Sequence, residues 1–211
     1  MSTAARLLPR IGFGFLVFLA VGVGLVALRF LTFDPAVAPP ELRANMEGRT
    51  LIFVVHTIAG AVAMLVGIWQ FLPRTRRTRW HRIEGRVYVA ACLIGAPAGF
   101  YIAWFSTAGI FASVGFAILA VLWFAATLTG FIYARQRNYA QHRRWMIRSY
   151  ALTAAAITLR LITGIGGALG FSFYEAYIPA AWLCWIINLA LVELWLATRP
   201  EKPLAEILAT R

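Results

Sequence analysis

Long apolar runs separated by short polar segments dominate the chain. About 20 mostly apolar residues, at a rise of 1.5 Å each, cross roughly 30 Å of hydrocarbon, and such a helix satisfies its own backbone polar groups. The pattern therefore predicts an all-α fold, an integral membrane bundle of six transmembrane helices. They are expected near residues 11–31, 49–72, 85–105, 111–134, 149–170 and 177–197.

Composition agrees with this interpretation. The 211 residues are 61% hydrophobic and 13% charged, with a mean hydropathy of +0.74, which is far from the composition of a soluble globular domain. We expect residues 1–211 to form a single membrane domain. The first apolar run, from Ile11 to Leu28, exceeds the roughly 7 to 15 residues of a signal-peptide core, so we expect a retained helix.

The net charge of +12 is distributed unevenly along the chain. Most lysines and arginines lie near the two ends of the chain and in two segments, 74–86 and 135–148. Because cationic loops stay on the cytoplasmic side, we expect a multi-pass membrane protein with both termini cytoplasmic. Anionic lipid of the bilayer is the expected partner of this charge. No recognition motif accompanies it, so we expect no nucleic-acid partner.

Two basic segments, residues 81–88 and 142–150, resemble each other, and each is followed by an apolar run. Two interpretations stay open. One is a duplicated two-helix hairpin that forms a four-helix core, with the first and sixth helices outside it; the other is a similar basic flank that membrane topology produced twice. Alignment places His81-Arg82 opposite His142-Arg143 and, after a one-residue offset, Arg86 and Tyr88 opposite Arg148 and Tyr150.

Polar side chains also fall inside the apolar runs. Arg160 lies about 16 Å from the inner end of its predicted helix, and His56 about 10 Å from the outer end, so their depths are similar. We expect both helix faces to point into the bundle. The first face carries His56, Gly60, Ala63, Gly67 and Gln70, and the second carries Ser149, Thr153, Ala156, Arg160, Thr163 and Gly167.

An arginine at mid-membrane costs about 2.5 to 3.5 kcal/mol to insert, and it normally pairs or serves a pathway. Glu193 lies only about 6 Å deep, too far from Arg160 for a simple ion pair. A haem propionate or a quinone oxygen would supply a partner for Arg160. Neutral hydrogen bonding by Thr153, Thr163, Asn188, water or backbone carbonyls is the alternative. For His56, haem ligation, proton relay, quinone binding and simple packing stay open.

His81 and His142 occupy equivalent places in the repeat, near the inner edge of the membrane. Two neutral imidazoles can serve as the axial iron ligands of haem b, and the nearby arginines Arg82, Arg86, Arg143 and Arg148 would neutralise its propionates. The alternative is a basic interfacial segment in contact with lipid headgroups. Three histidines are too few for two bis-histidine haems.

Several motifs resemble a family of bacterial membrane proteins catalogued as domain of unknown function 2306. They are His56 with Gly60, GIWQFLP at 67–73, HRIEGRVYV at 81–89 and HRRWMIRSYALTAAAITLRL at 142–161. The resemblance covers roughly residues 50 to 197. It implies a location in the bacterial inner membrane and a multi-helix fold, and it brings no established activity. The architecture also resembles b-type cytochromes, from which this chain departs in its three histidines.

These observations predict an inner-membrane protein that binds a redox cofactor, haem b or quinone, within the bundle and takes part in electron transfer with a redox partner protein. His56, or His81 with His142, would contact the cofactor, and Arg160, Asn188 and the inner arginines would hold its polar groups. The alternatives are non-catalytic binding or transport of a small anion or lipid, and a scaffold or assembly subunit. The chain has no soluble-enzyme catalytic motif.

Overall fold

The computed structural model describes residues 3–71 and 78–199, with side chains from residue 11 onward. Residues 1–2, 72–77 and 200–211 lie outside the described part. The expected helix end at residue 72, and part of the charge asymmetry behind the topology prediction, therefore also lie outside it. The cations concerned are Arg6 and Arg10, whose side chains are not described, and Arg74, Arg76, Arg77, Lys202 and Arg211.

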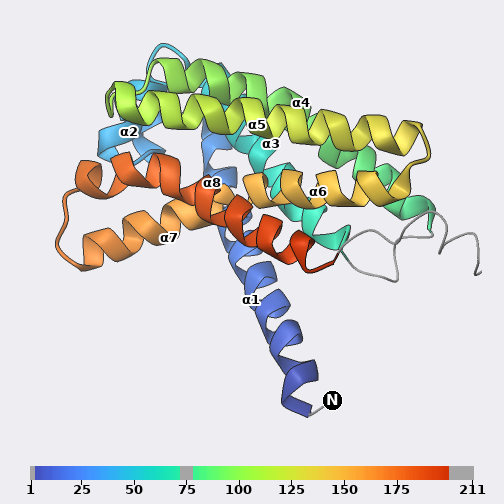
Figure 1. The fold of residues 1–211 in the computed structure, drawn as a ribbon. Coiled ribbons are helices and arrows are strands. Elements are labelled where there is room, and N and C mark those ends of the chain that lie inside the picture. Colours follow the sequence, from blue (N-terminus) through green and yellow to red (C-terminus); the bar gives the residue numbers. More distant parts are fainter. Residues whose placement is uncertain (1–2, 72–77, 200–211) are drawn as a thin grey trace, which may run out of the picture.

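Helices make up most of the described chain, which contains no strand (Figure 1). Six spans are long and apolar enough to cross a membrane, as the hydropathy pattern predicted. The fifth span consists of two helices, α6 and α7. The α-helices are α1 (Thr3–Ala27), α2 (Pro40–Met46), α3 (Thr50–Trp69), α4 (Arg79–Trp104), α5 (Ile110–Arg135), α6 (Tyr139–Thr153), α7 (Ala155–Ala168) and α8 (Phe173–Ala197), and two short 3₁₀ helices, η1 (Leu28–Thr32) and η2 (Pro35–Val37), follow α1.

Helices α4 and α6 begin six and ten residues earlier than hydropathy predicted, because side-chain caps start them among basic residues. The Thr78 hydroxyl accepts a hydrogen bond from the His81 N–H at 3.3 Å at the start of α4. The Asn138 side chain accepts one from the Gln141 N–H at 3.2 Å at the start of α6. Caps of this kind satisfy backbone donors that a helix start leaves free. The two basic segments are therefore the first turns of α4 and α6.

Helices α3, α4, α5 and α6 form the centre of the molecule. Each packs against the next, and α6 also contacts α3. Helix α1 packs on α3, and α8 packs on α5, α6 and α7. The first and sixth spans therefore lie outside a four-helix core, the arrangement that the duplication hypothesis expected. In Figure 1 the N-terminal half of α1 points away from the other helices.

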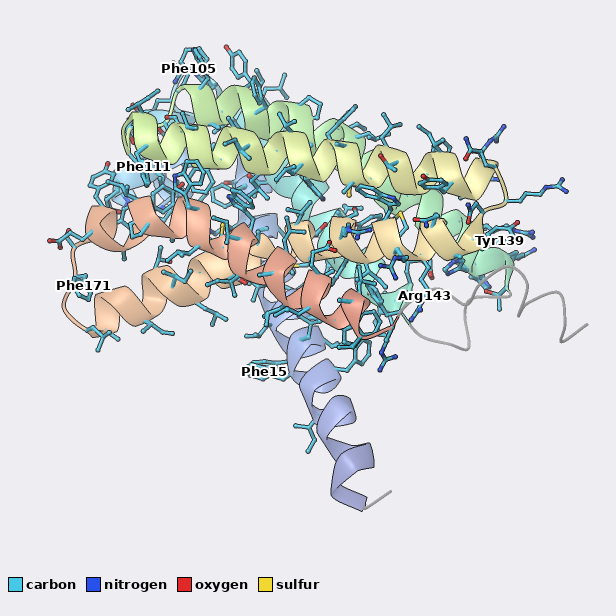
Figure 2. All side chains as sticks on the ribbon, in the orientation of Figure 1. Phe15, Phe105, Phe111, Tyr139, Arg143 and Phe171 are labelled. Atoms are coloured by element: carbon cyan, nitrogen blue, oxygen red, sulfur yellow. The ribbon has the colours of Figure 1, made fainter. Side chains whose placement is uncertain are left out.

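The two ends of the bundle differ in chemistry. Tyr139 and Arg143 mark one end in Figure 2, where nitrogen-tipped side chains gather, and Phe105, Phe111 and Phe171 mark the other. We call the first the arginine-rich end and the second the aromatic end. Helix α2 lies at the aromatic end (Figure 1), and Phe30 of η1 packs with Met46 of α2 and Val54 of α3.

The two tyrosines that the repeat aligns meet in the core. The ring centroids of Tyr88 and Tyr150 are 6.4 Å apart. Both rings lie against Gly67, where an added Cβ would come within 2.6 Å of Tyr88 and 2.7 Å of Tyr150. The Tyr88 hydroxyl is hydrogen bonded to Ser149 Oγ at 2.8 Å and to Thr153 Oγ1 at 2.9 Å. A small residue on α3 thus lets α4 and α6 close over it.

Candidate functional site: a polar and aromatic cavity beside a broken helix

The fifth span is interrupted at Ala154. The Ala154 N–H still donates to Tyr150 O at 2.8 Å, and the next helix, α7, begins at Ala155. Asn188 of α8 binds on both sides of the break: its amide nitrogen donates to Ala151 O at 3.0 Å, and its amide oxygen accepts from Thr158 Oγ1 at 2.9 Å. A side chain inserted into the helical ladder is a common cause of a kink. Beyond the break, α7 diverges from the line of α6 (Figure 1).

A cavity of about 340 Å³ lies beside this break, in the half of the bundle toward the aromatic end. This volume is at the lower end of the range of about 300 to 1,000 Å³ that is usual for ligand sites. Residues of α3, α4, α5 and α7 contribute most of its walls, together with parts of α1, α8 and the segment around α2. Most of the lining side chains are apolar, and none of the described lining residues is Asp or Glu.

His56 lines the cavity from α3. Its Nδ1 lies 2.8 Å from Gly95 O on α4. The ring reaches α4 because that helix has glycine at position 99, where an added Cβ would lie 2.6 Å from the imidazole. Helix α4 therefore holds the His56 ring in one orientation by a hydrogen bond and by close contact.

Arg160 lines the same cavity from α7. Its Nη1 donates to Ala156 O at 2.8 Å, and no carboxylate in the described part of the chain forms an ion pair with it. His56 is six residues from the start of α3 and Arg160 is eight residues from the end of α7, which places them about 9 and 12 Å from the same end of the bundle. The similar depth expected from the sequence is confirmed, and the cavity brings the two residues together.

Arg29 adds a second cation to the cavity lining, from η1 at the aromatic end. Arg29 and Arg160 therefore make the cavity electropositive, since acidic side chains are absent from its described lining. Flat apolar surfaces complete the walls. The aromatic lining residues are Phe30, Phe53, Phe116, Trp123, Phe173 and Tyr177.

Comparison with family models places residues 53–196 of the chain in one family, whose description reads "Predicted membrane protein (DUF2306)". The chain belongs to the DUF2306 family. The resemblance seen in the sequence motifs is thereby confirmed. The DUF2306 match contains both His56 and Arg160, whereas Arg29 precedes it. No curated protein and no solved structure matches the chain.

Other residues of the DUF2306 segment that the sequence singled out lie outside the cavity lining. Asn188 is engaged at the helix break. Arg148 forms two hydrogen bonds to Glu193, Nε to Oε1 at 2.5 Å and Nη2 to Oε2 at 2.8 Å. Glu193 thus pairs with an arginine near its own depth rather than with Arg160, in agreement with the depth argument.

The two histidines proposed as haem ligands lie in the first turns of α4 and α6. His142 Nδ1 is 2.8 Å from Gly130 O. Neither His81 nor His142 lines the cavity, and the same holds for Arg82, Arg86 and Arg143. Within residues 3–71 and 78–199, no group of three or more His, Cys, Asp or Glu side chains could hold a metal ion. The haem-ligand role of His81 and His142 stays a prediction.

Sequence reasoning missed Arg29 and the aromatic lining of the cavity. Arg29 follows an apolar run and reads as a helix-flanking cation, so its position gave no reason to separate it from the other arginines. Trp123 lies in the middle of an apolar run, where tryptophan is unusual because it favours the membrane interface, and its position was an available signal. Tyr177 is the first residue of the predicted span 177–197, so it could be interpreted as an ordinary interfacial tyrosine.

Proposed function

We propose that this DUF2306 protein binds a quinone in the cavity between α3, α4, α5 and α7 and takes part in electron transfer in the membrane. The observation that carries the proposal is that Arg160 shares an apolar, aromatic-lined cavity with His56, while no described lining residue is acidic. A quinone offers carbonyl oxygens to the guanidinium donors and a flat ring to the aromatic side chains.

A quinone also fits the surroundings of the site. Quinones dissolve in the lipid bilayer, which surrounds the six apolar spans. Interconversion of quinone and quinol moves two electrons and two protons, so a redox partner protein would exchange the electrons. The protein itself would then hold the ring in place, since its positively charged and aromatic groups are suited to binding rather than to electron storage.

The proposed setting is the bacterial inner membrane, with the arginine-rich end on the cytoplasmic side. The cavity then lies in the outer half of the membrane. Fusions of a periplasm-active and a cytoplasm-active reporter to the C-terminus test this orientation. We expect activity only from the cytoplasm-active reporter; activity only from the periplasm-active one would reverse the topology.

Binding can be tested with decylubiquinone as the probe. The protein is purified in mild detergent, its lipid extract is examined for co-purified quinone by mass spectrometry, and the affinity for decylubiquinone is measured. Hydrogen bonds to charged groups contribute about 1.5 to 3 kcal/mol, which corresponds to a weakening of roughly 10- to 150-fold in Arg160→Gln. The matched control Arg86→Gln changes an exposed arginine outside the cavity and should leave affinity unchanged. Equal affinities of the two variants would contradict the proposal.

A second function is favoured by the presence of two cations, Arg29 and Arg160, in one cavity. Two arginines suit a phosphate group, either in a small anion or in a lipid headgroup. The two functions respond differently to Arg29→Gln, because a phosphate uses both charges whereas a quinone carbonyl needs one donor. Two results together would favour this second function: the wild type binds phosphatidylglycerol but not decylubiquinone, and Arg29→Gln loses the phosphatidylglycerol binding.

A further inference from the structure

The hydrogen bond between His56 and α4 determines which ring nitrogen carries the proton. Nδ1 lies 2.8 Å from Gly95 O. A carbonyl oxygen can only accept, so Nδ1 must be the donor. A neutral imidazole has a single N–H, and which nitrogen carries it follows from the bond that the other nitrogen leaves possible. Neutral His56 therefore has a proton on Nδ1 and a lone pair on Nε2.

The Nε2 atom of His56 is available to a ligand. Within the described residues, the His56 ring forms one hydrogen bond, through Nδ1, and its Nε2 is not buried without a partner, so this atom lies in open space. The residue itself lines the cavity. The side chain therefore presents a hydrogen-bond acceptor to whatever occupies that space.

Arg160 presents the opposite chemistry at a similar depth. A guanidinium carries five N–H donors and no acceptor. One N–H of Nη1 is occupied by Ala156 O, which leaves further donors for a ligand. The cavity thus has an acceptor on the α3 wall and donors on the α7 wall. A ligand that satisfies both walls must donate one hydrogen bond and accept another.

This requirement separates the two redox forms of a quinone. The oxidised form has carbonyl oxygens that only accept, so one of them would face the Nε2 lone pair. The reduced quinol has hydroxyl groups that both donate and accept. We propose that the cavity selects the quinol, with one hydroxyl donating to His56 Nε2 and another ligand oxygen accepting from Arg160. The inference rests on the proposed function and specifies the form of the ligand.

The test compares two probes, decylubiquinol and decylubiquinone, under anaerobic conditions at a pH where imidazole is neutral. The full-length protein in detergent should bind the quinol at least about tenfold more tightly than the quinone. The quinol makes one more hydrogen bond, to His56 Nε2, whereas a quinone oxygen would face that nitrogen as a second acceptor. His56→Asn is the informative variant, because the shorter amide can still donate to Gly95 O but has no group at the Nε2 position. We expect it to bring the two affinities close together. Thr50→Val, which removes a hydroxyl of the same helix outside the cavity lining, should keep the preference.

The possible outcomes separate this inference from the proposed function. Equal binding of both probes by the wild type, or tighter binding of the quinone, overturns quinol selection and leaves quinone binding intact. Binding of neither probe overturns both. An unchanged preference in His56→Asn also overturns the inference, and if that variant does not fold, the wild-type ratio still decides it.

Discussion

Asn188 and Thr158 are joined by a hydrogen bond of 2.9 Å that connects α8 to the first turn of α7. The amide nitrogen of Asn188 donates a second hydrogen bond to Ala151 O, on the other side of the helix break. One side chain thus satisfies backbone and hydroxyl groups on both sides of an interruption that would otherwise leave a carbonyl free inside the membrane.

We expect Asn188→Leu to lower the free energy of unfolding by about 1 to 2 kcal/mol, because it removes both bonds. Thr158→Val should cost about 0.6 kcal/mol, the average for a side-chain hydrogen bond within a membrane protein. The double variant should be no less stable than Asn188→Leu alone, since the Thr158 bond needs Asn188 as its partner. Reversible unfolding in mixed detergent micelles measures all three, and strictly additive losses would contradict the bridging role.

A second prediction concerns two glycines on one face of α3. Gly67→Ala should destabilise the fold by about 1 to 3 kcal/mol, because the added methyl group would lie 2.6 Å from the Tyr88 ring and overpack the core. Gly60→Ala is the matched control, since an added Cβ there meets no atom within 4 Å. Melting temperatures in detergent should fall for the first variant only. Gly60→Ala should affect binding, because Gly60 lines the cavity.

A third prediction compares the two core tyrosines. The Tyr88 hydroxyl is hydrogen bonded to Ser149 and Thr153, whereas that of Tyr150 donates one bond of 3.2 Å to Met64 O. Tyr88→Phe leaves two buried hydroxyls with one fewer partner each, at a cost of about 1 to 3 kcal/mol. Tyr150→Phe should cost less than Tyr88→Phe. A greater loss in Tyr150→Phe would contradict the importance of the hydroxyl network, because both variants keep the ring and differ only in the hydrogen bonds that they remove.

A fourth prediction concerns haem. The quinone proposal places the ligand in the cavity with His56 and Arg160 rather than at His81 and His142, and on this proposal we expect purified protein to show no Soret band after expression with adequate haem. Visible spectra of the oxidised and reduced protein test this. A low-spin spectrum that disappears in both His81→Ala and His142→Ala, and persists in His56→Ala, would establish the haem site and contradict our expectation.

Local sequence determined the spans and the depth of their polar residues. An apolar run of sufficient length favours a helix in a bilayer, because hydrogen bonds within the helix satisfy nearly all of its backbone polar groups without water. The depths of His56 and Arg160 followed from helix rise alone, and Glu193 was recognised as too shallow for Arg160 by the same arithmetic. The predicted starts of α4 and α6 were too late, because a hydropathy average contains no information on the capping hydrogen bonds of Thr78 and Asn138.

Only the tertiary structure decided that a cavity exists beside Arg160. The segment ALTAAAITLR contains no glycine or proline that would predict a break at Ala154. The break is accompanied by Asn188 of another helix, 37 residues from Ala151 in the sequence, whose amide nitrogen donates to the Ala151 carbonyl. Likewise, Gly95 O decides the proton position on His56 from the neighbouring helix. Hydropathy and helical periodicity report on a residue and its own helix. The break at Ala154 and the proton position on His56 instead involve hydrogen bonds between two helices.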